Sequence, residues 1–266
     1  MQLFKHFSRA FMSLLRIIAS VGLEVIVKDN GNIPISDREA LLILPGFGSK
    51  LNGTQHQKRF FAHQGFDLFI PQYISRTSLK DSIQTLDEFI EKHHLKNYRK
   101  VHVFAYIVGS WAINEWILAN PKHNIATIIY DRSPLQERAP AVLTQDRPLL
   151  MRIGAGPILK EFSKMPYPSI EKQDIRIGII VESKATAIIR QHKKTTMAMG
   201  ALRWDLAQFQ QTYDDAFYTW LNHDEMYTHL DVIGDDVLYF IKNGRFTEGA
   251  KRKPLEGDPF MLIDLR

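Results

Sequence analysis

The chain has 266 residues, of which 45% are hydrophobic and 24% are charged, and its formal net charge is +5. These values suit one large globular α/β domain, or two small ones, and allow a sizeable buried core. The absence of cysteine excludes disulfides and thiolate metal sites. The mild positive charge is typical of a protein with scattered lysines, and we expect no nucleic-acid partner.

The first 22 residues are expected to form an amphipathic N-terminal helix. Arg9 and Arg16 interrupt the apolar stretch, which argues against a signal peptide, and no run approaches the roughly 18 apolar residues of a membrane span. The apolar positions share one helical face: Phe4, Phe7, Phe11, Leu14, Leu15 and Ile18. That face could pack on the protein itself, contact a membrane surface through residues 1–20, or belong to a degenerate targeting segment. We predict a cytoplasmic protein, with peripheral membrane contact as the alternative.

Apolar runs alternate with helical periods along residues 23–246, which we expect to form one domain. Strands are predicted at 40–49, 65–74, 101–109, 125–134, 175–183 and 216–221. Helices are predicted at 78–94, 110–119 and 230–242, and Ser78 with Asp81 forms a capping-box pattern at the first of them. Residues 135–172 contain several prolines and no clear period, which indicates a lid or an irregular insertion. The basic residues 247–266 are expected to form a solvated tail.

This alternation predicts an α/β fold with a mostly parallel sheet that is flanked by helices on both faces. Such a sheet binds its ligands beyond the carboxyl ends of the strands. Polar residues that follow the predicted strands are therefore candidate site residues: Ser49, Tyr106, Asp131, Glu182 and His223.

The order of parts from about residue 38 to residue 246 resembles the α/β-hydrolase fold, in particular its lipase and esterase-like branch. The resemblance rests on the Pro-Gly-Phe-Gly loop at 45–48, the strand–turn–helix at 101–119, and His223 followed by a helix and Gly244-Arg245-Phe246. It implies a nucleophile elbow in the strand–turn–helix segment.

The elbow of this family is Gly-x-Ser-x-Gly, on a strained turn from a strand into a helix. The matching residues here run from Ala105 to Gly109, and Ile107 stands where the family has its serine. Isoleucine has no lone pair with which to attack a carbonyl and no proton to give to a base. The elbow is therefore predicted to be degenerate.

The resemblance also implies a catalytic histidine and an acid. His223 matches the histidine in position, although a purely structural histidine is the alternative. The usual Asp-Gly position of the acid is matched by Lys194, which would repel an imidazolium. Glu182 or Asp131, both placed at strand ends, could act as the acid instead, or could be ordinary strand-end carboxylates.

The resemblance further implies an oxyanion hole made by the backbone N–H groups of Phe47 and Val108. Ser49 and Tyr106 are expected to line the same pocket. No zinc-binding HExxH and no nucleotide-phosphate loop occurs, so no metal and no cofactor are expected.

Two functional hypotheses follow. The first is a pseudoenzyme that binds a small molecule, a lipid or a protein partner. The alternative is an active esterase or lipase-like hydrolase with a displaced nucleophile, Ser110 or Ser49, acting with His223 and with Glu182 or Asp131. A membrane-surface accessory role through residues 1–20 is compatible with the first.

Overall fold

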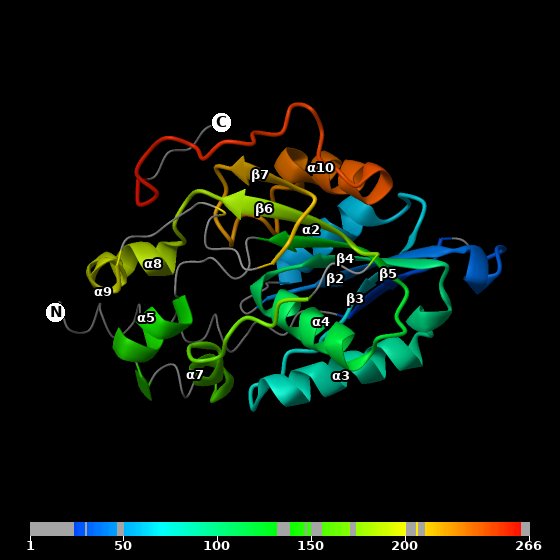
Figure 1. The fold of residues 1–266 in the computed structure, drawn as a ribbon, viewed down its shortest axis with the longest axis horizontal. Coiled ribbons are helices and arrows are strands. Elements are labelled where there is room, and N and C mark those ends of the chain that lie inside the picture. Colours follow the sequence, from blue (N-terminus) through cyan, green and yellow to red (C-terminus); the bar gives the residue numbers. More distant parts are fainter. Residues whose placement is uncertain are drawn as a thin grey trace.

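The computed structural model describes residues 24–261 except 30, 47–50, 132–138, 147, 150–155, 171–173, 201–205 and 207–210. The expected N-terminal helix of residues 1–22 lies outside these described residues. Within them, strands and helices alternate along the chain as the apolar periods predict, and they form a sheet covered on both faces (Figure 1).

The sheet has seven strands in the order β1-β3-β2-β4-β5-β6-β7. Their bounds are β1 Val25–Val27, β2 Glu39–Leu44, β3 Asp67–Ile70, β4 Lys100–Ala105, β5 Ile125–Asp131, β6 Arg176–Glu182 and β7 Asp215–Thr219. All neighbours pair in parallel except β1, which runs antiparallel to β3 with Val25 opposite Ile70. The predicted mostly parallel sheet is confirmed. The short edge strand β1 had no prediction, because a three-residue run is too brief to show a period.

The strands form because their apolar side chains are buried on both faces. In β2, residues Ala40 to Leu44 are all fully buried. A strand between two covered faces reads as a continuous apolar run, without the alternation of a half-exposed strand. The observed strands are shorter than the apolar runs: the run 65–74 contains β3 at 67–70, and the run 216–221 corresponds to β7 at 215–219.

Helices cover both faces of the sheet (Figure 1). Helices α2 (Leu51–Phe61) and α10 (Leu230–Asn243) share one apolar cluster with residues of β2 and β4. They approach closely, since a Cβ added at Gly234 would meet the Phe60 ring at 2.2 Å. Helices α3 (Leu79–Lys92) and α4 (Ile107–Ala119) share the opposite cluster. Ser78 Oγ accepts the Asp81 N–H at 3.0 Å, as predicted for the start of α3.

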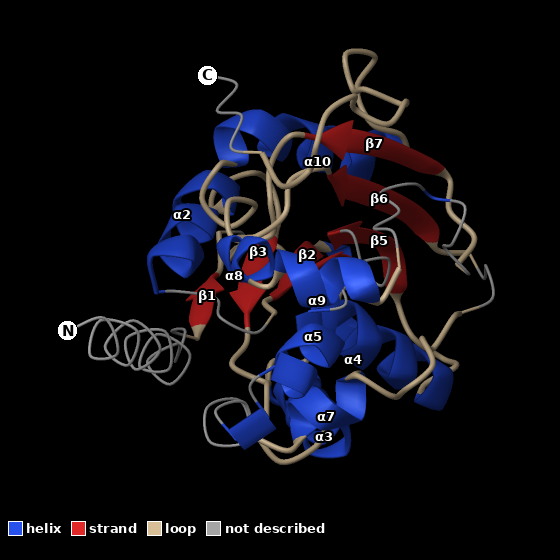
Figure 2. Cartoon of the chain, turned by 90° about the vertical axis from the view of Figure 1, so that its left-hand side faces the viewer, coloured by secondary structure: helices blue, strands red, loops and turns tan. Residues whose placement is uncertain are grey.

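Short helices lie on the side of the sheet where the parallel strands end (Figures 1 and 2). They are α5 (Ala139–Asp146), α7 (Ile158–Phe162), α8 (Ala187–Gln191) and α9 (Lys193–Ala198), and single 3-10 turns occur at Ile35–Asp37 and Leu95–Asn97. The described part of the predicted insertion, 135–172, thus contains α5 and α7. Phe162 and Tyr167 pack edge-on against Trp111 of α4, which attaches this insertion to the body of the domain.

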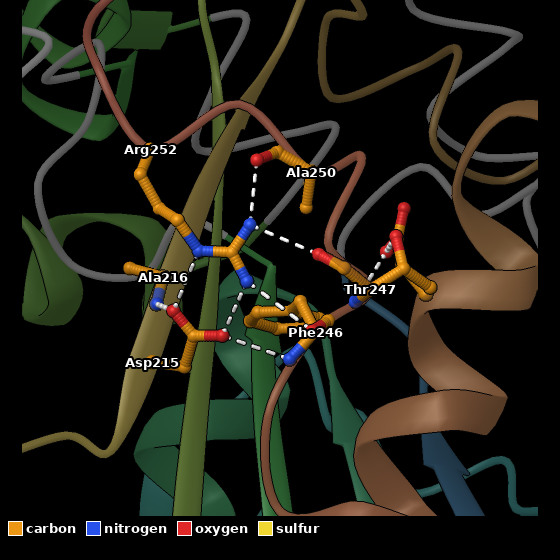
Figure 3. Close-up of polar contacts among 7 residues, drawn as sticks. Asp215, Ala216, Phe246, Thr247, Ala250 and Arg252 are labelled. Atoms are coloured by element: carbon orange, nitrogen blue, oxygen red, sulfur yellow. Dashed lines mark hydrogen bonds and ion pairs between the residues drawn. The ribbon is translucent and has the colours of Figure 1, made fainter.

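The C-terminal segment has exposed side chains but an anchored backbone. The N–H of Tyr218 in β7 donates to the Lys251 carbonyl at 2.8 Å. Arg252 makes two contacts with the Asp215 carboxylate, at 2.8 and 3.2 Å, and also donates to the Thr247 and Ala250 carbonyls (Figure 3). Most described side chains of the predicted solvated tail are exposed, but its backbone is tied to the edge strand β7 at Lys251.

Candidate functional site

Three polar side chains converge where adjacent strands end. Asp131 is the last residue of β5, Glu182 is the last residue of β6, and His223 lies in the loop after β7. Because these strands are neighbours, their carboxyl ends meet at one edge of the sheet. Nδ1 of His223 lies 2.9 Å from Oδ2 of Asp131 and 3.7 Å from Oε1 of Glu182. The structure therefore brings together both acids and the histidine that were predicted as site residues.

Burial and charge fix the protonation of His223. Both carboxylates are fully buried, and His223 is 9% exposed. Burial alone would lower the pKa of the imidazole, but the hydrogen bond with Asp131 and the negative charges of Asp131 and Glu182 outweigh it and raise the pKa to about 10. His223 is therefore an imidazolium at neutral pH, with a proton on each ring nitrogen.

Tyr227 occupies the other side of the imidazolium. Its hydroxyl oxygen accepts the Gly46 N–H at 2.9 Å and lies 3.5 Å from Nε2 of His223, at the long limit of a hydrogen bond. The Tyr227 ring stacks on Tyr106 with ring centroids 4.0 Å apart. Burial raises the pKa of both phenols, so both stay neutral. A Cβ added at Gly46 would lie 3.0 Å from the Tyr227 hydroxyl, which is why glycine fits this position.

Tyr106, predicted to line the pocket, is held by two further contacts. Its hydroxyl accepts a hydrogen bond from the Gln57 side chain at 2.8 Å and donates to the Met226 carbonyl at 3.2 Å. Its ring also packs against the His223 ring in a T-shaped arrangement, with centroids 6.0 Å apart. The aromatic pair of Tyr106 and Tyr227 thus fills the space beside the imidazolium with the protein's own side chains.

Ile107 begins helix α4 directly after the strand–helix turn. The residue before it, Tyr106, has extended backbone with φ −81° and ψ 161°. Among the described non-glycine residues, positive φ occurs only at His63 and His94, so the Ile107 backbone does not adopt the left-handed conformation. A β-branched residue such as isoleucine would be strained in the left-handed conformation. Gly109 is required for another reason, because a Cβ would lie 2.6 Å from the Leu44 carbonyl oxygen.

The predicted alternative nucleophile Ser110 is engaged by its own helix and by Tyr167. Its hydroxyl donates to the Ile107 carbonyl at 2.8 Å, and the side chain is fully buried. Within the described part of the chain, the polar atoms around the ring nitrogens of His223 belong to Asp131, Glu182 and Tyr227, and none belongs to a serine.

The predicted oxyanion donors are described only in part. Val108 lies in the first turn of α4, where backbone N–H groups have no partner within the helix. Phe47 and Ser49 lie outside the described residues. Gly46, next to Phe47, is described, and its N–H already donates to Tyr227.

Asp131, Glu182 and His223 are also the one group in the described chain with the donor set of a metal site. One ligand atom from each lies within 4.8 Å of the others. Two carboxylates and an imidazole suit a divalent cation. A cation would have to displace the proton of Nδ1, which the neighbouring carboxylates hold tightly. That the protein binds no metal stays a prediction.

Sequence reasoning missed Tyr227 and Gln57. Tyr227 follows His223 by four residues in a segment with no predicted element, and Gln57 lies in α2. Neither has a local signal, because each acts through a residue far away in sequence: Tyr227 contacts Gly46 and Gln57 contacts Tyr106.

No family model matches the sequence, and no curated protein matches it. Solved structures do resemble the chain. A bromoperoxidase from Bacillus anthracis has a TM-score of 0.52 at 12% identity, over 83% of this chain and 100% of that chain. The lipase BlEst2 from Bacillus licheniformis has a TM-score of 0.51 at 11% identity, over 82% and 98%. An alpha/beta hydrolase fold protein from Chitinophaga pinensis has a TM-score of 0.50 at 12% identity, over 85% and 99%. Together with the mostly parallel seven-stranded sheet, these likenesses show that the chain has the α/β-hydrolase fold.

Proposed function

We propose that this chain is a non-catalytic member of the α/β-hydrolase fold, a pseudoenzyme that binds a small molecule, a lipid or a protein partner. The observation that carries the proposal is the place of Tyr227. Its hydroxyl takes the Gly46 N–H and faces Nε2 of His223, the atom with which a serine hydrolase removes the proton of its nucleophile. A serine at position 107 would have to compete with this tyrosine for the imidazole.

The charge of His223 supports the same conclusion. A general base works best when its pKa is near the working pH. With a pKa of about 10, only about one molecule in a thousand carries a neutral His223 at pH 7. Ile107 supplies no group to deprotonate. Both chemical steps of a serine mechanism, proton removal and nucleophilic attack, therefore lack a competent group.

A hydrolase with a displaced nucleophile is the second candidate. The 2.9 Å contact between His223 and Asp131 favours it, since it has the geometry of the base and acid of a catalytic triad. The hydrogen bond from Ser110 to the Ile107 carbonyl weighs against Ser110 as the attacking group. Ser49 is the other serine in this alternative.

Ester hydrolysis separates the two candidates. Nitrophenyl acetate, butyrate and octanoate would be tested with wild-type protein and with His223→Ala and Ser110→Ala. We expect equal, background rates for all three proteins. Wild-type turnover that either substitution abolishes would overturn the pseudoenzyme proposal. Each variant would first be compared with wild type by circular dichroism, so that loss of fold is not read as loss of activity.

We further propose a cytoplasmic location, with residues 1–20 as a peripheral membrane contact. Across the described residues, no helix is long and apolar enough to cross a bilayer. In the sequence of residues 1–20 the apolar positions recur at helical spacing with basic residues between them, a pattern that suits the surface of an anionic bilayer. Sedimentation with anionic vesicles should remove the full-length protein from the supernatant, whereas a protein without residues 1–20 should stay in the supernatant. Equal sedimentation of both would refute this contact.

A further inference from the structure

A second charged pair lies in the loops that carry the candidate site. Lys184 follows Glu182 by two residues after β6, and Glu225 follows His223 by two residues after β7. The Lys184 ammonium lies 2.7 Å from Oε1 of Glu225, and these side chains are only 7% and 27% exposed. Removing a lysine from water is costly and the attraction of a buried pair offsets that cost only in part. A net gain in folding stability is therefore a weak explanation for the presence of this largely buried ion pair.

Glu225 also shapes the turn that contains His223. Its second oxygen, Oε2, accepts the N–H of Asn222 at 2.9 Å, and the Asn222 side chain accepts the N–H of Glu225 at 3.1 Å. His223 lies between these two residues in the chain. Its backbone is thus held from both sides by reciprocal hydrogen bonds.

The loops after β6 and β7 are joined by backbone hydrogen bonds as well. The N–H of Ser183 donates to the Thr219 carbonyl at 2.8 Å, and the N–H of Lys184 donates to the Leu221 carbonyl at 3.3 Å. These bonds continue the parallel β6–β7 pairing past the ends of the strands. The Lys184–Glu225 pair is the next contact outward, and it joins the loop of Glu182 to the turn of His223.

We propose that Lys184 and Glu225 are positioning residues, which hold the His223 ring between Asp131 and Glu182. The polar groups that face the ring come from β5 (Asp131), from β6 (Glu182), and from Tyr227 beside Nε2. Tyr106 packs against the ring in a T-shaped arrangement. The inference concerns the geometry of His223 and does not depend on whether the protein hydrolyses esters.

The test is the pH at which His223 loses its proton, followed through its ring nitrogens by NMR in ¹⁵N-labelled full-length protein. The signal would be assigned by comparison with His223→Gln. In Lys184→Met and in Glu225→Gln we expect deprotonation at least about one pH unit lower, a tenfold weaker hold on the proton. Lys193→Met removes an exposed pair with Asp258 and serves as the control, with the wild-type titration expected.

The sign of the shifts separates positioning from a direct effect of charge. Losing the Lys184 cation alone would strengthen proton binding at His223, whereas losing the Glu225 anion alone would weaken it. Positioning predicts weaker binding in both variants. Opposite shifts, or no shift in either variant, would overturn the proposal.

The choice of Glu225→Gln and one further variant, Lys184→Arg, guard against misfolding. Glu225→Gln keeps an acceptor for the Asn222 N–H, so it preserves the turn while removing the ion pair. Lys184→Arg keeps the cation and should retain the wild-type titration. If Lys184→Arg titrates like Lys184→Met, the ion pair does not position His223 and the proposal fails.

Discussion

Replacing His223 with glutamine is expected to remove a pH-dependent part of the stability. In the folded protein the pKa of His223 is raised to about 10, against an ordinary value near 6.5 in the unfolded chain. Because the folded value is the higher one, the contribution is fully present below about pH 6.5 and is lost as the pH rises towards 10. The difference of about 3.5 pH units corresponds to about 5 kcal/mol in the free energy of unfolding, at about 1.4 kcal/mol per unit.

The assay is urea unfolding of wild type and His223→Gln from pH 6 to pH 10, followed by circular dichroism. Lysines and tyrosines also titrate near pH 10, but they do so in both proteins and cancel in the difference. The stability difference between the two proteins should fall by up to about 5 kcal/mol over this range, with a slope of at most about 1.4 kcal/mol per pH unit.

His102 provides a matched control for this experiment. It is also buried and lies 3.3 Å from Glu39, but burial outweighs that carboxylate and lowers its pKa. His102 is thus neutral in the folded protein throughout the upper pH range. The difference between wild type and His102→Gln should be constant from pH 7 to pH 10. An equally constant difference for His223→Gln would refute the imidazolium held by two carboxylates.

Three further predictions concern the surroundings of the site and the fold. Gly46→Ala should place a methyl group against the Tyr227 hydroxyl and cost about 1–3 kcal/mol in unfolding free energy. Tyr227→Phe removes the hydroxyl that accepts the Gly46 N–H, so the losses of the two single variants should not add fully in the double variant. Full additivity would contradict this contact. Trp116→Ala should cost about 3–5 kcal/mol, because the side chain is 1% exposed within the core, and a loss below 1 kcal/mol in urea unfolding would contradict it. Arg252→Gln should lower the free energy of unfolding by about 1 kcal/mol or less, since the Arg252 side chain is 40% exposed. The same variant should be cleaved faster by trypsin after Lys251. Unchanged cleavage would show that Asp215 does not anchor the segment.

Much of the fold could be predicted from the sequence because the signals are local. The continuous apolar runs around Leu42 and Ile179 indicate strands that are buried on both faces, and such strands require a parallel sheet between helices. The capping pattern at Ser78 places the start of α3. Strand ends are less predictable, because pairing with neighbours, and not the length of the apolar run, decides where β3 and β7 stop.

The sequence alone indicated the alternation of strands and helices, and it placed Asp131, Glu182 and His223 at or after the ends of successive strands. Only the tertiary structure decided that both carboxylates meet the same imidazole, that Tyr227 takes the Gly46 N–H, and that the segment around Arg252 lies along β7. The physical reason is the separation along the sequence of the residues that interact. Periodicity and composition report what neighbouring residues prefer, whereas the charge state of His223 depends on two carboxylates at the ends of β5 and β6, which approach the loop after β7 only when the sheet has formed.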